Sequence, residues 1–217
     1  MKQVAVILSG SGVFDGAELH EAVLTLLAIE LEGAKYQCFA PDVEQLHVVN
    51  HLTGEVSEGE SRNVLVESAR IARGDIKPLK ECNVDAFDAL ILPGGFGAAK
   101  NLCTFAVDGS ECAFNDDLLD VCQRFAKAKK PAAYACVAPV LAAKVYGNNV
   151  KLTIGNDQAT AEGVNALGAS HVNCAVDDVV IDNEVKLVTT PAYMLATSIS
   201  EAHKSISKMV QTVLAMK

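Results

Sequence analysis

The chain has 217 residues, of which 50% are apolar and 21% charged, and its formal net charge is −9. The length suits one α/β domain with a sizeable core, and the apolar content argues against disorder. The chain has 27 acidic and 18 basic residues, and this negative net charge argues against a surface that binds nucleic acid or an anionic membrane. We therefore expect a globular protein that handles a small molecule, with neither nucleic acid nor membrane as a partner.

The N-terminal residues and the cysteines bear on the compartment. The apolar run 4–8 stops at Ser9, which is too short for a secretory signal, and no apolar stretch approaches the roughly 18–20 residues of a membrane span. The seven cysteines are odd in number and include no C-x-x-C pair, which argues against a disulfide scaffold and a zinc-finger spacing. These features predict a cytoplasmic protein without a metal site.

In the first half of the chain, short β-branched runs alternate with helical stretches, as in a parallel sheet with crossover helices. The helix after the first strand begins near Gly16, because Asp15 and Glu18 have capping-box spacing, and it ends at Gly33. Its expected core-facing residues are Leu19, Val23, Leu26, Leu27 and Leu31. The other elements expected here are strands at 4–8, 36–40 and 89–92, a short strand at 48–51, and a helix at 62–73.

The second half continues the alternation with weaker signals. It predicts strands at 131–136, 151–154, 179–181 and 186–189, and helices at 116–129, from 137 to about 145, at 158–167 and at 198–216. No linker or repeat divides the chain. We therefore expect a single domain over residues 1–217, an open doubly wound α/β sheet between two layers of helices.

Cys136 follows the expected strand at 131–136 within the sequence A-C-V-A-P. A thiol between a strand and a helix has the position of a nucleophile elbow, although its flanking residues are not the usual glycines. The N-terminus of the following helix would favour the thiolate. The alternative is a structural cysteine buried in a core strand.

The segment Pro93-Gly94-Gly95-Phe96-Gly97 follows the third expected strand. Its glycines could bring backbone N–H groups close to a developing negative charge, as in an oxyanion hole, or they could simply form a tight turn. Neither this segment nor the stretch 9–12 matches a phosphate-binding loop or the dinucleotide fingerprint. We therefore expect no cofactor.

Acidic and imidazole side chains near the first helix are candidates for proton transfer. Glu18 is expected to cap that helix, which leaves Glu21 free as a general base, unless it is only a solvated acid. Among the five histidines, His20 and His51 are the candidates to assist Cys136, although a surface position is the preferred interpretation of each. No histidine spacing indicates a metal site.

Several long motifs together resemble a known family. They are V-A-V-I-L-S-G-S-G-V-F-D-G-A-E-L-H-E-A, I-L-P-G-G-F-G-A-A-K-N, Y-A-C-V-A-P and V-T-T-P-A-Y-M. They resemble the ElbB-type glyoxalase-like proteins, in the PfpI branch of the class I glutamine-amidotransferase-like superfamily. The resemblance covers nearly the whole chain. It implies a flavodoxin-like sheet sandwiched by helices, usually in a homodimer.

The resemblance also implies roles for residues. It gives Cys136 as the nucleophile, Glu21 as the functional acid, and the backbone amides of Gly94 and Gly95 as groups that face the sulfur. We also expect the backbone amide of Val137 to belong to this oxyanion site. We expect His20, Ser11 and Phe96 to border a substrate pocket. One departure is that many catalytic relatives have His directly after the cysteine, whereas this chain has Val137.

The function expected from these residues is a cofactor-independent glyoxalase. It would convert glyoxal, or another small 2-oxoaldehyde, to the hydroxy acid through the cysteine nucleophile. Because the adjacent histidine is missing, a cysteine redox sensor with little turnover stays an alternative. Two further functions stay open at this point, namely a metabolic accessory or partner-binding protein and a protein deglycase.

Overall fold

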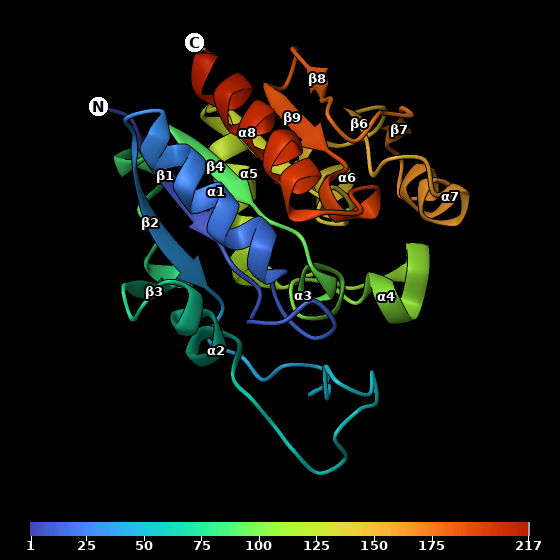
Figure 1. The fold of residues 1–217 in the computed structure, drawn as a ribbon. Helices are drawn as coiled ribbons and strands as arrows, with labels where there is room; N and C mark the ends of the chain where they lie inside the picture. Colours follow the sequence, from blue (N-terminus) through green and yellow to red (C-terminus); the bar gives the residue numbers. More distant parts are fainter. Residues whose placement is uncertain (217) are drawn as a thin grey trace.

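A seven-stranded sheet forms the centre of the computed structural model, which describes residues 1–216 (Figure 1). The strand order is β3-β2-β1-β4-β5-β9-β8. All neighbouring strands are parallel except β8, which is antiparallel to β9. The strands are β1 (Gln3–Ile7), β2 (Lys35–Ala40), β3 (Ile76–Pro78), β4 (Ala89–Leu92), β5 (Ala132–Ala135), β8 (Val180–Asp182) and β9 (Leu187–Thr190). The expected doubly wound, flavodoxin-like α/β fold is confirmed.

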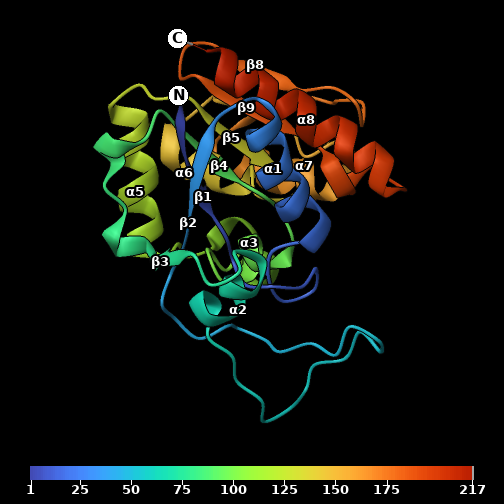
Figure 2. The same ribbon diagram turned by 60° about the vertical axis from the view of Figure 1, so that its left-hand side comes forward.

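Helices cover both faces of this sheet (Figures 1 and 2). One face carries α1 (Leu19–Leu31) and α8 (Ile199–Ala215), and the other carries α5 (Asp116–Lys127) and α6 (Val140–Tyr146). The remaining helices are α2 (Val64–Ile71), α3 (Phe96–Lys100), α4 (Phe105–Asp108) and α7 (Gln158–Ala166), with short 3-10 turns at Leu79–Glu81, Val84–Ala86, Gly109–Glu111 and Ala192–Met194. A separate pair of parallel strands consists of β6 (Lys151–Leu152) and β7 (Ser170–His171).

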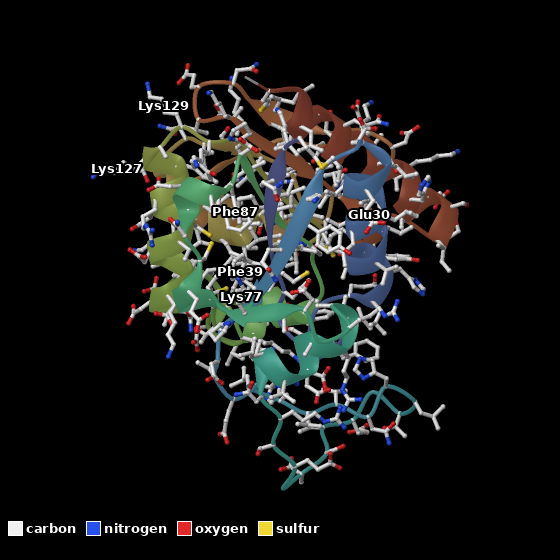
Figure 3. The ribbon with its side chains drawn as sticks, turned by 90° about the vertical axis from the view of Figure 1, so that its left-hand side faces the viewer. Glu30, Phe39, Lys77, Phe87, Lys127 and Lys129 are labelled. Atoms are coloured by element: carbon white, nitrogen blue, oxygen red, sulfur yellow. The ribbon has the colours of Figure 1, made fainter. Side chains whose placement is uncertain are left out.

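The central strands are apolar on both faces because both faces are covered. Val4 and Val6 of β1 pack toward α1 and α8, whereas Ala5 and Ile7 pack toward α5 and α6. On the second side the rings of Phe39 and Phe87 meet edge to face with centroids 5.6 Å apart (Figure 3). This continuous burial explains why the strand positions were predictable from apolar runs.

The orientation of α1 differs from expectation. The helix begins at Leu19, and Glu18 is its N-cap, whose carboxylate accepts the N–H of Glu21. Most of the expected core stripe faces outward, with exposed fractions of 45, 52, 42 and 70% for Leu19, Val23, Leu27 and Leu31. The buried residues are instead Glu21, Ala22, Thr25, Leu26, Ala28 and Ile29. Three of these buried side chains, Ala22, Thr25 and Ala28, are small, which suits close packing of α1 on the sheet and on α8.

Residues 41–63 form an extended excursion between β2 and α2 (Figures 1 and 2). Gln45, Val48 and Val49 are buried against the body of the molecule, whereas most of residues 50–63 are exposed. The strand expected at 48–51 is only an isolated antiparallel bridge between Val49 and Val56. The short elements β3, α3, α4 and β7 were not predicted, because two to five residues carry too little periodicity. Within residues 1–216 no helix is both long and apolar enough to cross a membrane.

Candidate functional site

Cys136 stands directly after β5 in a left-handed backbone conformation, with φ of +60°. Such a conformation is costly for a residue with a side chain and is kept only where the surroundings fix it. Here the N–H of Cys136 donates to the carbonyl of Thr190 on β9 at 3.0 Å. The N–H of Ala138 donates to the carbonyl of Ala135, also at 3.0 Å, and this hydrogen bond closes the turn around Cys136. The sharp turn expected of a nucleophile elbow is therefore present. The cysteine is 7% exposed.

Glu21 reaches the elbow from α1 and is fully buried. Its Oε2 accepts the N–H of Gly94 and its Oε1 accepts the N–H of Tyr193, both at 2.9 Å. Its carboxyl also lies within hydrogen-bonding reach of the Cys136 thiol. Three separate segments of chain thus hold one carboxyl group beside the sulfur.

Glycines permit this close approach. A Cβ on Gly94 would lie 2.3 Å from the Cβ of Cys136 and 2.7 Å from Oε2 of Glu21. Gly95 has φ of +97°, and a Cβ there would lie 2.3 Å from the backbone nitrogen of Glu18. No side chain fits at either position, so the Pro-Gly-Gly segment lets the loop after β4 lie directly against the elbow and the start of α1.

The charge of the carboxyl–thiol pair is limited by burial. Desolvation, assisted by the charge of Glu18, raises the pKa of Glu21 to about 7 against the lowering effect of its hydrogen bonds. Burial and the negative charge of Glu21 raise the pKa of Cys136 well above its ordinary range, although the amides of Gly95 and Val137 lower it. Two buried acids in contact do not both ionise readily. The pair therefore admits one negative charge and, contrary to expectation, the helix that follows does not by itself make the sulfur a thiolate.

The backbone amides divide into two groups. Gly95 and Val137 direct their N–H groups to the sulfur of Cys136. The N–H of Gly94 donates to Glu21 instead and is not free for an oxyanion. The structure thus keeps two of the three expected amides at the sulfur and uses the third to hold the acid.

The sulfur opens onto a cavity of about 310 Å³. Its lining residues are Val13, Glu18, Gly95, Phe96, Cys136, Val137, Thr160, Tyr193 and Met194. Phe96 is there as expected, but Ser11 is not part of this lining. His20 does not line the cavity, but its Nδ1 lies 2.8 Å from the hydroxyl of Tyr193, which does. The motif containing Tyr193 and Met194 supported the resemblance, but nothing in its spacing indicated that both side chains line the cavity.

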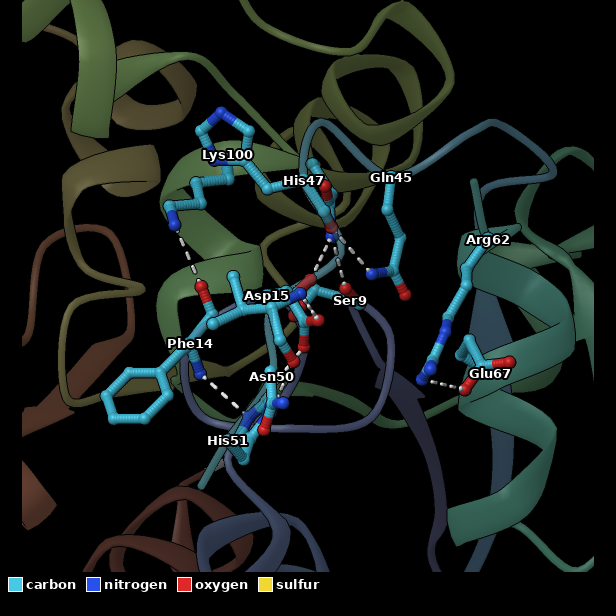
Figure 4. Close-up of polar contacts among 12 residues, drawn as sticks. Ser9, Phe14, Asp15, Gln45, His47, Asn50, His51, Arg62, Glu67 and Lys100 are labelled. Atoms are coloured by element: carbon cyan, nitrogen blue, oxygen red, sulfur yellow. Dashed lines mark hydrogen bonds and ion pairs between the residues drawn. The ribbon is translucent and has the colours of Figure 1, made fainter. Parts of the chain in front are cut away.

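His51 belongs to a different cluster, on the excursion of residues 41–63 (Figure 4). Its Nε2 accepts the N–H of Phe14 at 3.2 Å and lies 3.8 Å from Asp15. Among the residues that the structure describes, no histidine lines the cavity of Cys136, and no group of three or more His, Cys, Asp or Glu side chains could hold a metal ion. Glu21 is therefore the acid–base group in contact with the sulfur.

Among solved structures, an isoprenoid biosynthesis protein with an amidotransferase-like domain from Ehrlichia chaffeensis superposes with a TM-score of 0.92 at 34% identity, over 99% of this chain and 98% of that chain. DJ-1beta from Drosophila melanogaster superposes with a TM-score of 0.56 at 18% identity, over 98 and 94% of the two chains. A cysteine-to-alanine mutant of a DJ-1 superfamily protein from Salmonella typhimurium gives 0.60 at 20%, over 99 and 91%. The Drosophila and Salmonella structures, at 18 and 20% identity, show that their fold is also the fold of this chain.

Curated relatives match over the whole chain, although no family model matches. The rat (Rattus norvegicus) mitochondrial ES1 protein homolog is 49% identical over 99% of this chain and 84% of its own length. The human (Homo sapiens) mitochondrial glutamine amidotransferase-like class 1 domain-containing protein 3 is also 49% identical, over 99 and 83%. The zebrafish (Danio rerio) mitochondrial ES1 protein is 33% identical, over 98 and 85%.

These relatives correct one expectation and settle the family. The predicted cytoplasmic location is wrong, because all three relatives are mitochondrial proteins. Free cysteines indicate a reducing compartment, and they do not distinguish the cytosol from the interior of an organelle. The chain belongs to the class I glutamine amidotransferase-like family that includes the ES1 proteins, with the DJ-1/PfpI-type fold.

Proposed function

We propose that this protein is a cofactor-independent glyoxalase that acts on 2-oxoaldehydes, of which glyoxal is the simplest. The observation that carries the proposal is the contact between the Cys136 thiol, held in a strained elbow, and the buried carboxyl of Glu21, at the wall of a cavity. The resemblance of the motifs to ElbB-type glyoxalase-like proteins supports the same activity.

In the first step the sulfur of Cys136 attacks one aldehyde carbon. The S–C bond forms, the C=O π bond breaks, and the proton that the thiol and Glu21 share moves to the aldehyde oxygen, which gives a hemithioacetal. The N–H groups of Gly95 and Val137 face the sulfur and would lie beside the developing oxyanion. The reaction then leaves Glu21 as a carboxylate in contact with the new adduct.

In the second step Glu21 moves a proton between the two carbons. The carboxylate removes the hydrogen from the sulfur-bearing carbon to form an enediol, and returns a proton to the neighbouring carbon while the hydroxyl proton passes between the oxygens. The product is a thioester of the hydroxy acid. Water hydrolyses it, which releases the acid and restores the thiol, so that one water is consumed for each aldehyde. A pKa of about 7 suits Glu21 to both directions of this transfer.

The test is turnover of glyoxal by the Cys136→Ala variant. We expect wild-type protein to consume glyoxal and form glycolate, and Cys136→Ala to lose this activity at least 1,000-fold with an unchanged circular dichroism spectrum. Cys174→Ala is the matched control, because Cys174 is a partly exposed free thiol outside the cavity, and it should retain full activity. Glycolate formation by Cys136→Ala would refute the mechanism.

A second candidate, a peroxide-responsive cysteine, is favoured by the lack of histidine among the cavity-lining residues. In that reaction the thiolate attacks one peroxide oxygen, the O–O bond breaks, and hydroxide leaves as the sulfur becomes a sulfenic acid. Mass spectrometry after stoichiometric hydrogen peroxide separates the two functions. Selective oxidation at Cys136 in a protein that forms no glycolate would favour the sensor.

A further inference from the structure

A second cavity, of about 300 Å³, lies beside the cavity of Cys136. It is bordered by α3, α4 and α7, and α4 and α7 lie at the same end of the molecule in Figure 1. Phe96, Val137 and Thr160 line both cavities. The two cavities are therefore neighbours, and these three residues form the boundary between them.

The lining of this second cavity is almost wholly apolar. Besides the three shared residues it consists of Ala99, Phe105, Ala106 and Ala159. In the part of the chain that the structure describes, neither cavity is lined by Lys, Arg or His, and the ionisable groups at the first are Glu18, Cys136 and Tyr193. A phosphate or carboxylate group would find no cation among these lining residues. An uncharged, apolar group fits the surface.

Two contacts shape the walls of the second cavity. The ammonium group of Lys100, at the end of α3, lies 5.5 Å from the ring centroid of Phe96 and donates to the carbonyl of Phe14 at 2.9 Å, which helps to fix the shared ring. Phe105 also lines this cavity, and a Cβ on Gly163 of α7 would lie 2.8 Å from its ring. Glycine inside a helix is unfavourable, and here its lack of a side chain gives room to that ring.

The size of the combined space exceeds that of glyoxal. Four heavy atoms, taken at about 30 Å³ each as for liquid water, occupy roughly 120 Å³, and the cavity at the sulfur alone has about 310 Å³. Glyoxal would leave the second cavity empty. A substrate with its aldehyde at Cys136 and an apolar chain past Phe96 would use both.

We propose that the second cavity binds an apolar tail of the substrate, so that the protein prefers aldehydes with an alkyl or aryl substituent over glyoxal itself. The aldehyde chemistry rests on the proposed function. The tail-binding site rests on the cavity and its lining, and it can be tested without turnover.

The test uses alkylation of Cys136 by iodoacetamide and by N-hexyl iodoacetamide. In both reactions the sulfur displaces iodide, the S–C bond forms, and the thiol proton passes to solvent. Peptide mass spectrometry gives the rate at each cysteine, and Cys174 reports the intrinsic reactivity of the two reagents. We expect the hexyl group to accelerate alkylation at Cys136 at least tenfold relative to Cys174.

The rim of the second cavity offers a matched pair of variants. Ala159 lines the second cavity and Ala166 does not, and both are exposed residues of α7. Ala159→Phe should remove most of the hexyl acceleration and leave the iodoacetamide rate within twofold, whereas Ala166→Phe should change neither. Ala106→Phe, at the exposed rim on α4, repeats the test should Ala159→Phe fold poorly by circular dichroism.

The outcomes separate this proposal from the proposed function. Equal acceleration at Cys136 and Cys174, or acceleration that survives both cavity-filling variants, would overturn tail binding even if glyoxal is turned over. Acceleration that Ala159→Phe removes would support tail binding even if no glycolate forms, and the glyoxalase proposal alone would then fail. Where both hold, kcat/KM for hexylglyoxal should exceed that for glyoxal, and Ala159→Phe should reduce that preference.

Discussion

Two of the buried carboxylates in the segment that begins after β1, Glu21 and Asp15, differ in what surrounds them. Glu21 is fully buried and Asp15 is 2% exposed, and each accepts a main-chain N–H. Glu21 accepts the N–H groups of Gly94 and Tyr193 and touches a thiol. Asp15 instead accepts the N–H of Val49, at 2.7 Å, and lies 3.8 Å from the imidazole of His51 (Figure 4).

The groups around each buried acid determine what that acid can do. No cationic side chain is among the groups that set the pKa of Glu21, so burial dominates and a proton is retained near neutral pH, as acid–base work requires. Asp15 has a hydrogen bond from the excursion of residues 41–63 and an imidazole of that same excursion beside it. We infer that Glu21 serves the chemistry and that Asp15 fastens the excursion to the body.

The largest effect is expected from Glu21→Gln. The amide has nearly the shape of the carboxyl but cannot shuttle a proton, so kcat for glyoxal should fall about 10²–10⁴-fold. Glu18→Gln is the matched control. Glu18 lines the cavity and caps α1, but it is not among the groups that interact with the sulfur of Cys136. Its loss should be at most tenfold, and equal losses in the two variants would contradict the role given to Glu21.

The raised pKa of Glu21 predicts a pH dependence of stability. The unfolded chain releases this proton near 4.5 and the folded protein near 7. The contribution of Glu21 to stability is therefore complete below pH 4.5 and is lost as the pH rises to about 7, with a total of about 3 kcal/mol. Urea unfolding of wild type and Glu21→Gln across this range isolates the effect. Parallel curves for the two proteins would show that Glu21 titrates normally.

Asp15→Ala should act on the excursion and not on the sulfur. The buried N–H of Val49 would lose its acceptor, which costs about 1–3 kcal/mol, and hydrogen exchange at Val49 should accelerate. Asp15→Asn keeps an acceptor oxygen and should show a smaller change. The iodoacetamide rate at Cys136 should stay within twofold in both variants, and a large fall would mean that the two regions are coupled.

The two regions also mark what the sequence could predict. The strands next to the site were predictable, because a parallel sheet covered on both faces gives unbroken apolar runs such as Ala89–Leu92. The elbow at Cys136 and the Pro-Gly-Gly segment follow from residues at the ends of those strands. The resemblance of the motifs pointed to Glu21, which burial beside the sulfur supports.

The orientation of α1 was not predictable from its apolar pattern. The usual rule places the apolar stripe inward, but α1 buries Glu21 and Thr25 and exposes Val23 and Leu31. A helix that must approach a sheet closely and deliver an acid to it uses small and polar residues on that face. Distant segments complete the site as well, since Thr160 and Tyr193 line the cavity from α7 and from the turn after β9, and no local spacing reports such contacts.

The smallest effect is expected from His51→Ala, which tests whether the excursion is independent of the sulfur. The imidazole Nδ1 lies 3.0 Å from the carbonyl of Val49, while Nε2 accepts the N–H of Phe14. Both contacts together require a neutral ring with its proton on Nδ1. Their loss at a partly exposed position should cost about 1 kcal/mol and increase proteolysis within residues 41–63. Turnover of glyoxal should change less than threefold, because His51 reaches neither Cys136 nor Glu21. A loss as large as that of Glu21→Gln would make His51 part of the reactive site and would remove the distinction between the two carboxylates.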